Sequence, residues 1–216
     1  MTEHSTSPRH SLPATEVVVF DGFDDLDAIG PLETLTEAGF PTRVVRPAGH
    51  PTAVHSAHGL VMEVAAELGA AFDVSDAAPA LIIVPGGGWL DAGPGVRDQC
   101  EGPLPEALAA LHGAGAVLAS VCTGAMLLAR AGVLTGRPAV TNRNALDDLA
   151  AAGAEVRGDA RVVDDGTVVT GGGPAAGLDV AIRLVARFAG EEAGRQAAAR
   201  LEHEPVGPVL VGVGTA

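Results

Sequence analysis

The sequence contains neither lysine nor tyrosine, and all of its basic residues are arginine. The absence of lysine excludes a Schiff-base lysine, a P-loop lysine and a serine–lysine dyad. Positive charge is scarce as well, because 13 basic residues stand against 27 acidic ones and the net charge is −14. Nucleic acids and anionic membranes require a basic patch that this balance does not favour. We therefore expect a small-molecule substrate, and neither nucleic acid nor a membrane as a partner.

Cysteine and long apolar runs are also scarce. Two cysteines in 216 residues do not make a disulfide framework, and they predict a reduced, cytoplasmic protein. No apolar run approaches the ~20 residues of a membrane span. The polar opening, residues 1–15, lacks the apolar core of a signal peptide. Abundant alanine, glycine and arginine without lysine point to a GC-rich bacterial genome.

Short apolar segments alternate with longer amphipathic ones along most of the chain. The apolar segments are typical of buried parallel strands, and the amphipathic ones of helices. This alternation predicts an α/β fold: a doubly wound, mostly parallel sheet flanked by helices, as in a flavodoxin-like sandwich with a nucleophile elbow. We expect a disordered leader at 1–15, a single domain at 16–204 and a C-terminal tail at 205–216. The expected strands are 17–20, 42–46, 59–65, 81–85, 116–121 and 138–141, with a hairpin at 161–173, and the expected helices are 26–38 (kinked or starting late because of Gly30-Pro31), 104–115, 123–134, 145–153, 177–190 and 191–203.

Cys122 lies at the junction between the apolar segment 116–121 and the helix expected to follow it. This is the layout of a nucleophile elbow, in which a strained turn projects the side chain at the carboxyl edge of the sheet. The N–H groups and the dipole of the following helix favour a thiolate. We therefore predict a functional thiol at Cys122, against the alternative of a small buried hydrophobe. Cys100 follows no strand, and we interpret it as an incidental thiol.

Two further loops follow predicted strands. The glycine turn at 86–88 offers backbone N–H groups for an oxyanion site; the alternative is a tight turn without a ligand. Asp27 stands at the start of the first helix, where the residues alone favour a helix cap over a carboxylate turned into the crevice. In an apolar crevice beside a thiolate its pKa would rise, which suits a proton donor. Trp89, the single tryptophan, either lines a pocket or covers the core.

None of the seven histidines stands in a metal-binding pattern. HExxH motifs and Cys/His clusters are absent from the sequence, so we expect no metal site. A catalytic Cys–His pair would need a histidine after a strand near Cys122. The strand expected there, 138–141, is followed by Asn142 and Arg143 instead. The sequence therefore names no catalytic histidine.

Three segments taken together resemble a known family: LIIVPGGG at 81–88, SVCTGAMLLARAGVLTGRPAVT at 120–141 and TVVTGGGPAAGLDVAIRLV at 167–185. Their order resembles that of the ThiJ/PfpI superfamily, which has the class I glutamine-amidotransferase-like fold. LDAIGPLETL at 26–35, with SVCTGA and TGGGPAAGLD, is most similar to the isonitrile hydratase branch. The resemblance covers residues 16–204.

The resemblance implies an enzyme that adds water to an isonitrile, R–N≡C, and produces an N-formamide. In that branch an elbow cysteine adds to the isonitrile carbon, and a carboxylate in the first strand–helix loop moves the protons. These roles carry over to Cys122 and Asp27, so the resemblance favours a catalytic Asp27 over a cap. Many relatives carry histidine where this chain has Asn142, and chemistry that relies on a Cys–His pair is therefore disfavoured.

On this interpretation the Cys122 thiolate attacks the terminal carbon and protonated Asp27 supplies a proton, giving a thioimidate; ionised Asp27 then activates water. No cofactor is needed, and the family precedent implies a homodimer. Two alternatives stay open: a cysteine-dependent hydratase or lyase acting on another electrophile of specialised metabolism, and a non-enzymatic thiol redox sensor or chaperone. The candidate oxyanion and substrate-binding residues are Gly86, Gly87, Trp89, Thr123 and Asn142, with the N–H groups near Gly87 and Thr123 expected to hold developing negative charge.

Overall fold

The computed structural model describes residues 12–70, 80–89 and 93–212. The described strands form a seven-stranded central sheet in the order β11-β9-β10-β6-β5-β1-β2. Strands β2, β1, β5, β6 and β10 run parallel, whereas β9 is antiparallel to β10 and β11 is parallel to β9. This sheet confirms the predicted doubly wound, mostly parallel α/β fold. Its strands are β1 (Thr15–Val18), β2 (Thr42–Val45), β5 (Leu81–Val84), β6 (Val117–Ser120), β9 (Val162–Asp164), β10 (Val168–Gly171) and β11 (Val209–Val211).

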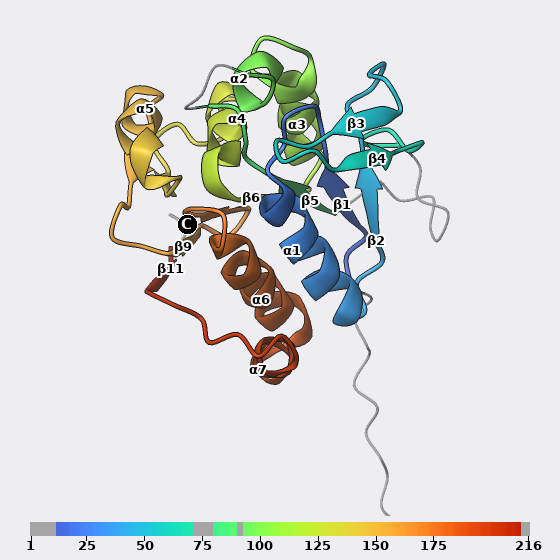
Figure 1. Ribbon diagram of the computed structural model, residues 1–216. Coiled ribbons are helices and arrows are strands. Elements are labelled where there is room, and N and C mark those ends of the chain that lie inside the picture. Colours follow the sequence, from blue (N-terminus) through green and yellow to red (C-terminus); the bar gives the residue numbers. More distant parts are fainter. Residues whose placement is uncertain (1–11, 71–79, 90–92, 213–216) are drawn as a thin grey trace, which may run out of the picture.

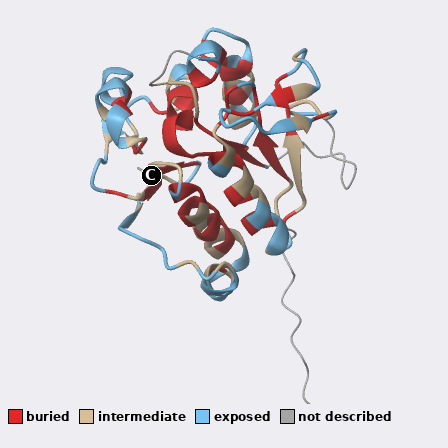
Figure 2. Ribbon diagram, viewed as in Figure 1, coloured by how far each residue is buried: buried red, intermediate tan, exposed pale blue. Residues whose placement is uncertain are grey.

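Helices cover both faces of the sheet (Figure 1). On one face α1 (Asp25–Glu37) and α6 (Ala176–Ala189) lie side by side, and α7 (Glu191–Arg200) packs against α6. On the other face lie α3 (Leu104–Gly113) and α4 (Ala125–Arg130), with the short helices α2 (Val96–Gln99) and α5 (Leu146–Ala151) beside them. Because both faces are covered, every residue of β1, β5 and β10 is buried (Figure 2).

The sequence predicted that Gly30-Pro31 would either kink the first helix or make it start late. Helix α1 begins at Asp25 and runs through both residues, so it does not start late. Asp24 caps it, because the Asp24 side chain accepts the N–H of Leu26 at 3.2 Å. Gly30-Pro31 instead lies against α6: a Cβ at Gly177 would stand only 3.3 Å from Pro31 Cδ. The glycines and the proline ring therefore allow α1 and α6 to pack closely.

Two segments predicted as strands of the main sheet form small separate sheets. β4 (Val61–Glu63) makes an antiparallel hairpin with β3 (Ala53–His55), and β7 (Pro138–Ala139) pairs in parallel with β8 (Glu155–Val156). The residues of β4 are exposed or half-buried, whereas strands of a sheet covered on both faces are buried. The amino-acid preference for strand does not distinguish these two situations.

The chain beyond residue 204 contributes an edge strand. β11 pairs with β9, so the sheet extends into the segment predicted as a C-terminal tail. The hairpin predicted at 161–173 is present as the antiparallel pair β9–β10. Most of the predicted leader, residues 1–11, lies outside the described residues, and β1 begins at Thr15.

Candidate active site

The carboxyl ends of the parallel strands meet at one edge of the sheet, and the predicted site residues come from the loops that leave this edge. Asp27 lies after β1, the glycine turn at 86–88 follows β5, and Cys122 follows β6. Asn142 follows β7 and reaches the same place. The structure thus brings together six of the predicted site residues: Asp27, Gly86, Gly87, Cys122, Thr123 and Asn142.

Cys122 stands at a sharp strand-to-helix turn. Its φ is +54°, in the left-handed region that non-glycine residues rarely adopt. A 3₁₀ turn (Cys122–Gly124) joins β6 to α4 and is pressed against β5, since a Cβ at Gly124 would lie 2.3 Å from the carbonyl oxygen of Val84. The Thr141 hydroxyl donates to the carbonyl of Cys122 at 2.8 Å and holds the strained residue in place. This is the geometry of a nucleophile elbow.

The Cys122 sulfur is nearly enclosed and lies among hydrogen-bond donors. Asn142 Nδ2 donates to Sγ at 3.3 Å, and the backbone N–H of Thr123 also hydrogen-bonds to it. The residue is 5% exposed, and this burial raises the pKa of the thiol to about 12, with the negative charge of ionised Asp27 acting in the same direction. The hydrogen bonds oppose the shift without cancelling it. The neutral thiol is therefore favoured over the thiolate, which corrects the expectation based on the helix start.

Asp27 is completely buried beside the thiol. Its Oδ2 accepts the N–H of Gly86 at 2.9 Å, while its Oδ1 has no hydrogen-bond partner among the described residues. Burial, reinforced by the negative charge of Asp24, raises the pKa of the Asp27 carboxyl to about 8, and the Gly86 N–H and the Cys122 thiol oppose the shift. Asp27 is thus a neutral acid at pH 7 and not the cap of α1, a position that Asp24 occupies.

Cys122 and Asp27 titrate as a unit, which we call the thiol–acid pair. Because each negative charge disfavours the other, the pair carries two protons at low pH and loses the first near pH 8. Above that pH it holds one proton, which stays on the sulfur because the thiol has the higher pKa. A nucleophile and a proton carrier that share one proton in an enclosed site are suited to add H–S across a polar multiple bond.

The glycine turn at 86–88 contributes its N–H groups to this assembly. The Gly86 N–H is taken by Asp27, and the Gly87 N–H donates to Thr123 Oγ1 at 3.0 Å. A Cβ at Gly86 would stand 2.6 Å from Thr123 Oγ1 and 2.8 Å from Asp27 Oδ2, so the side chains close on the bare backbone. These N–H groups therefore orient the side chains of the site, whereas the sequence predicted that Gly87 holds charge on the substrate.

A cleft of about 750 Å³ opens beside Asn142. It lies between the start of α5 and the chain that leads to β11, and Asn142 connects it to the Cys122 sulfur. Its polar and charged walls include Arg143, Asp159 and Arg161, and glycines 172 and 173 also line it. The cleft is large enough for a small-molecule ligand.

Trp89 lies apart from this cleft. Its indole N–H donates to Asp148 Oδ2 at 2.8 Å, and the guanidinium of Arg97 stands 4.4 Å from the centre of its ring. Together with Cys100 it lines a separate cavity of about 370 Å³. Cys100 and Cys122 are both free thiols, and burial raises the pKa of Cys100 to about 11. The structure brings neither Trp89 nor Cys100 into the cluster around Cys122.

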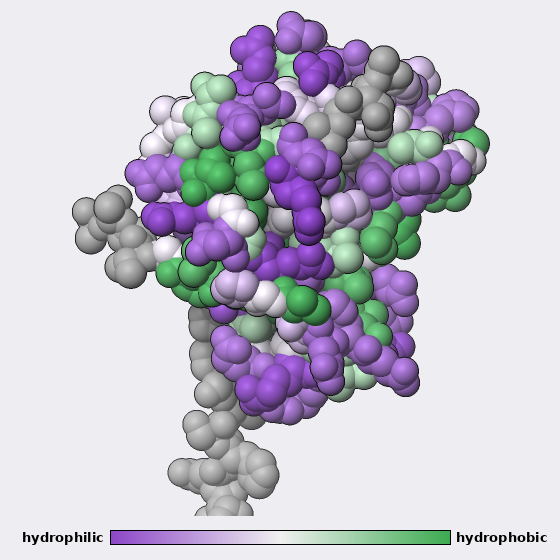
Figure 3. Space-filling model, turned by 60° about the vertical axis from the view of Figure 1, so that its left-hand side comes forward, coloured by the Kyte–Doolittle hydropathy of each residue, from purple (hydrophilic) through white to green (hydrophobic). Residues whose placement is uncertain are grey.

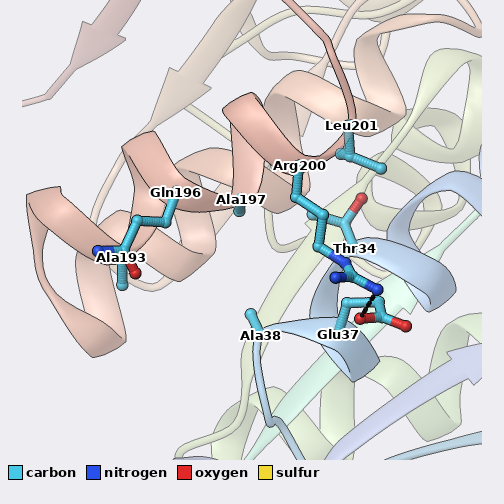
Figure 4. Close-up of a pocket in the computed structure, with 8 residues that line it drawn as sticks. All are labelled: Thr34, Glu37, Ala38, Ala193, Gln196, Ala197, Arg200 and Leu201. Carbon is cyan, nitrogen blue, oxygen red and sulfur yellow. Dashed lines mark ion pairs between the residues drawn. The ribbon is translucent and has the colours of Figure 1, made fainter.

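Another cavity, of about 260 Å³, lies between α1 and α7 (Figure 4). The ion pair between Arg200 and Glu37, at 2.6 Å, crosses it, and alanine side chains of both helices line it. It contains no residue of the thiol–acid pair or of the turn at 86–88. This cavity is therefore separate from the cluster at the edge of the sheet.

Two residues of the site were missed by sequence reasoning. Asp24 both caps α1 and raises the pKa of Asp27, and its signal was an aspartate directly before a helical pattern. Thr141 supports the carbonyl of Cys122 from the loop after β7, and a polar residue at the end of an apolar segment was its only signal. Among the described residues no three His, Cys, Asp or Glu side chains gather as a metal site, and no helix is long and apolar enough to cross a bilayer.

The sheet, the elbow cysteine and the buried carboxylic acid define an α/β protein built around a nucleophile elbow. Residues 15–187 match the DJ-1/PfpI family, and the chain belongs to this family. The resemblance to the ThiJ/PfpI superfamily is thereby confirmed.

Individual relatives share different parts of the chain. An isonitrile hydratase from Pseudomonas putida is 36% identical over 128 residues, which cover 59% of this chain and only 54% of that relative. The Parkinson disease protein 7 homolog of Danio rerio is 25% identical over 186 residues, covering 86% of this chain and 94% of the relative. The crystal structure of a ThiJ/PfpI family protein from Pseudomonas syringae has a TM-score of 0.77 at 26% identity, covering 94% of this chain and 80% of that one. Drosophila melanogaster DJ-1beta, with a TM-score of 0.76 at 20% identity, covering 90% of this chain and 100% of that one, shares the fold.

Proposed function

We propose that this protein is an isonitrile hydratase, which converts R–N≡C and water into R–NH–CHO. The observation that carries the proposal is the thiol–acid pair: a nucleophile lies beside a buried carboxyl whose pKa of about 8 lets it both give and take a proton near neutral pH. The terminal carbon of an isonitrile needs both a nucleophile and a proton. The similarity to the isonitrile hydratase from Pseudomonas putida supports the same reaction.

The first step starts from the pair with one proton. The Cys122 sulfur bonds to the terminal carbon while its proton passes through the Asp27 carboxyl to that same carbon. The product is a neutral thioimidate, R–N=CH–S–Cys122, and Asp27 is left ionised. The unpartnered Oδ1 of Asp27 is the atom we assign to this proton, since Oδ2 is held by Gly86.

Water completes the reaction in two steps. Asp27 removes a proton from water as the oxygen adds to the thioimidate carbon, and it delivers that proton to nitrogen, giving R–NH–CH(OH)–S–Cys122. The carbon–sulfur bond then breaks as the carbonyl forms, and the hydroxyl proton returns through Asp27 to sulfur. One water is consumed and the pair regains its starting state. The Asn142 amide and the Thr123 N–H, which already donate to sulfur, stabilise the sulfur as it leaves.

Formamide production tests the proposal. The purified protein is incubated with one aliphatic and one aromatic isonitrile, and the N-formamide is measured by mass spectrometry. Wild type and Cys100→Ala, the matched control at the other buried cysteine, are expected to turn over. Cys122→Ala and Asp27→Asn are expected to lose turnover by at least about a thousandfold, because each lacks one half of the pair.

The opposite result is equally informative. If wild type forms no formamide while iodoacetamide still alkylates Cys122, isonitrile hydration is refuted and another electrophile becomes the substrate. Redox sensing is the weaker alternative, because oxidation follows thiolate character and burial raises the pKa of Cys122 to about 12.

We further propose a cytoplasmic homodimer. Apolar side chains are exposed at the start of α1 and on the β3–β4 hairpin, where Leu26, Leu60 and Val61 are 44%, 42% and 57% exposed. The contact between His58 Nδ1 and Asp25 Oδ2, at 2.8 Å, joins these two elements into one surface. Light scattering during gel filtration is expected to give twice the chain mass of 21.5 kDa, and Leu60→Glu with Val61→Glu is expected to give the monomer.

A further inference from the structure

Two arginines line the cleft beside Asn142 in a strongly acidic protein. Its charged lining residues are Arg143, Arg161 and Asp159, whereas the chain as a whole has a net charge of −14. The side of the molecule that carries α5 and this cleft faces the viewer in Figure 3, and hydrophilic side chains predominate there while hydrophobic ones form separate patches. Two arginines in one cleft are a concentration of charge that the composition does not predict.

The two arginines have unused hydrogen-bond donors. Arg161 is anchored through Nε, which donates to Asp179 Oδ2 at 2.8 Å, and the other oxygen of Asp179 lies 2.8 Å from His203 Nε2. Among the described residues no acceptor binds the terminal amino groups of Arg161, and Arg143 has neither an ion pair nor a hydrogen bond. Guanidinium groups with free donors in a cleft are a typical site for a carboxylate or a phosphate.

The cleft borders the residue that contacts the reacting sulfur. That residue is Asn142, which lines the cleft and donates to Cys122 Sγ at 3.3 Å. Glycine at position 173 leaves the space beside Asn142 open: a Cβ there would have Asn142 Nδ2, at 4.0 Å, as its single neighbour within 4 Å. A ligand that reaches Cys122 past Asn142 would lie along the wall that also carries the two arginines.

We infer that the cleft binds a carboxylate at the end of the substrate remote from the reacting group. The inference rests on the proposed function, and it makes the substrates isonitriles that carry a carboxylate. Arg161 is already ion-paired with Asp179, and Asp159 in the lining offsets the charge of Arg143, so these four groups carry no net charge before a ligand binds. The site therefore tolerates a singly charged carboxylate better than a doubly charged phosphate, and the unused donors of the two arginines supply the contacts. Arg143 is a specificity-determining residue, and Arg161 completes the site from its anchored position.

Matched pairs of substrates test the inference. The rates of 3-isocyanopropanoate, 5-isocyanopentanoate and 7-isocyanoheptanoate are compared with those of their methyl esters. We expect kcat/KM for at least one carboxylate to exceed that of its ester by about tenfold to a hundredfold, the range of a charge-assisted contact. Arg143→Gln is expected to remove this preference by lowering kcat/KM for the carboxylate at least about tenfold more than for the ester, and raised salt is expected to reduce the preference. The control, Arg157→Gln, removes an exposed arginine outside the cleft and is expected to change neither rate.

A binding measurement separates the two proposals. The Cys122→Ala variant is titrated with each carboxylate and each ester by calorimetry, which needs no turnover. Carboxylate-selective binding that depends on Arg143, together with no formamide from wild type, would overturn isonitrile hydration and leave the anion site standing. Equal rates for acids and esters in wild type, with no effect of Arg143→Gln on either rates or binding, would overturn the anion site and leave hydration standing.

Discussion

Replacing Asp27 with asparagine is expected to stabilise the folded protein at neutral and alkaline pH. The substitution keeps the size of the side chain and leaves an oxygen to accept the N–H of Gly86, as Asp27 Oδ2 does at 2.9 Å. Asparagine resembles the protonated carboxyl, with a hydrogen-bond donor at the position of the unpartnered Oδ1. The variant therefore removes the titration of this group and preserves the packing around it.

The magnitude follows from the two pKa values of the carboxyl. Its ordinary value is 3.8, and in the folded protein it is raised to about 8. Between these values the unfolded chain is ionised while the folded protein keeps its proton, so the unfolded state binds fewer protons and the wild-type free energy of unfolding falls as pH rises. The slope is about 1.4 kcal/mol per pH unit, which amounts to roughly 4 kcal/mol between pH 5 and pH 8. Above pH 8 the folded protein ionises too, and the loss levels off.

Urea unfolding followed by circular dichroism measures this difference. Wild type, Asp27→Asn and Asp98→Asn are unfolded at pH 5, 6, 7 and 8; Asp98 is an exposed aspartate on α2 and serves as the control. Other groups titrate alike in all three proteins, so only the difference from wild type counts. We expect the gain of Asp27→Asn to grow steadily with pH and that of Asp98→Asn to stay constant. A gain that does not change with pH would refute the reasoning, because it would mean that Asp27 is ionised in the folded protein throughout this range.

Turnover, the glycine turn and the cap of α1 each give a further measurable outcome. For an uncharged isonitrile, kcat/KM is expected to rise with pH through about 8 and to be about fiftyfold lower at pH 6 than at pH 8. The reason is that about half of the thiol–acid pair has lost its first proton at pH 8 but only about 1% at pH 6. A flat pH–rate profile would contradict this prediction. Gly86→Ala is expected to lower kcat at least about tenfold and to reduce the melting temperature by several degrees, because its Cβ would meet Thr123 Oγ1 at 2.6 Å. In the control, Gly113→Ala, the added Cβ meets nothing within 4 Å, and we expect it to change neither kcat nor the melting temperature. Asp24→Asn keeps a good helix cap and removes a negative charge, so the rising limb of the pH–rate profile is expected to move to lower pH with the melting temperature unchanged; an unmoved limb would show that Asp24 does not act on Asp27.

The sequence predicted the main sheet and the elbow because both depend on local patterns. The apolar strand before Cys122 and the small residues after it lie within one short segment, and so does the hairpin at 161–173. The placement of β4 and β7 could not be predicted in this way, since it depends on which strands the helices cover and not on residue preference. Long-range contacts decided those elements.

The site shows the same division between local and long-range causes. The identity of Cys122 as an elbow residue is local, but its pKa is set by enclosure between several loops, and the local helix start predicted the wrong direction. The neutral state of Asp27 likewise depends on complete burial and on Asp24, which sequence cannot evaluate. The link from Cys122 through Asn142 to a cleft with two arginines joins segments that are far apart in the chain.

The burial of Asp27 has opposite consequences for stability and for chemistry. A buried carboxyl with a raised pKa weakens the fold at neutral pH, and asparagine in its place would remove that cost. The same burial brings the pKa of the carboxyl to about 8, so that in the proposed reaction it can lose its proton near neutral pH and then pass the thiol proton to the isonitrile carbon. Arg143 and Arg161 line the neighbouring cleft, and neither is among the charges that shift the pKa of Cys122, so on our proposal they hold the substrate without altering the proton balance of the thiol–acid pair. A centre that moves protons beside a cleft lined by arginines is therefore the arrangement that we propose for a carboxylate-bearing isonitrile.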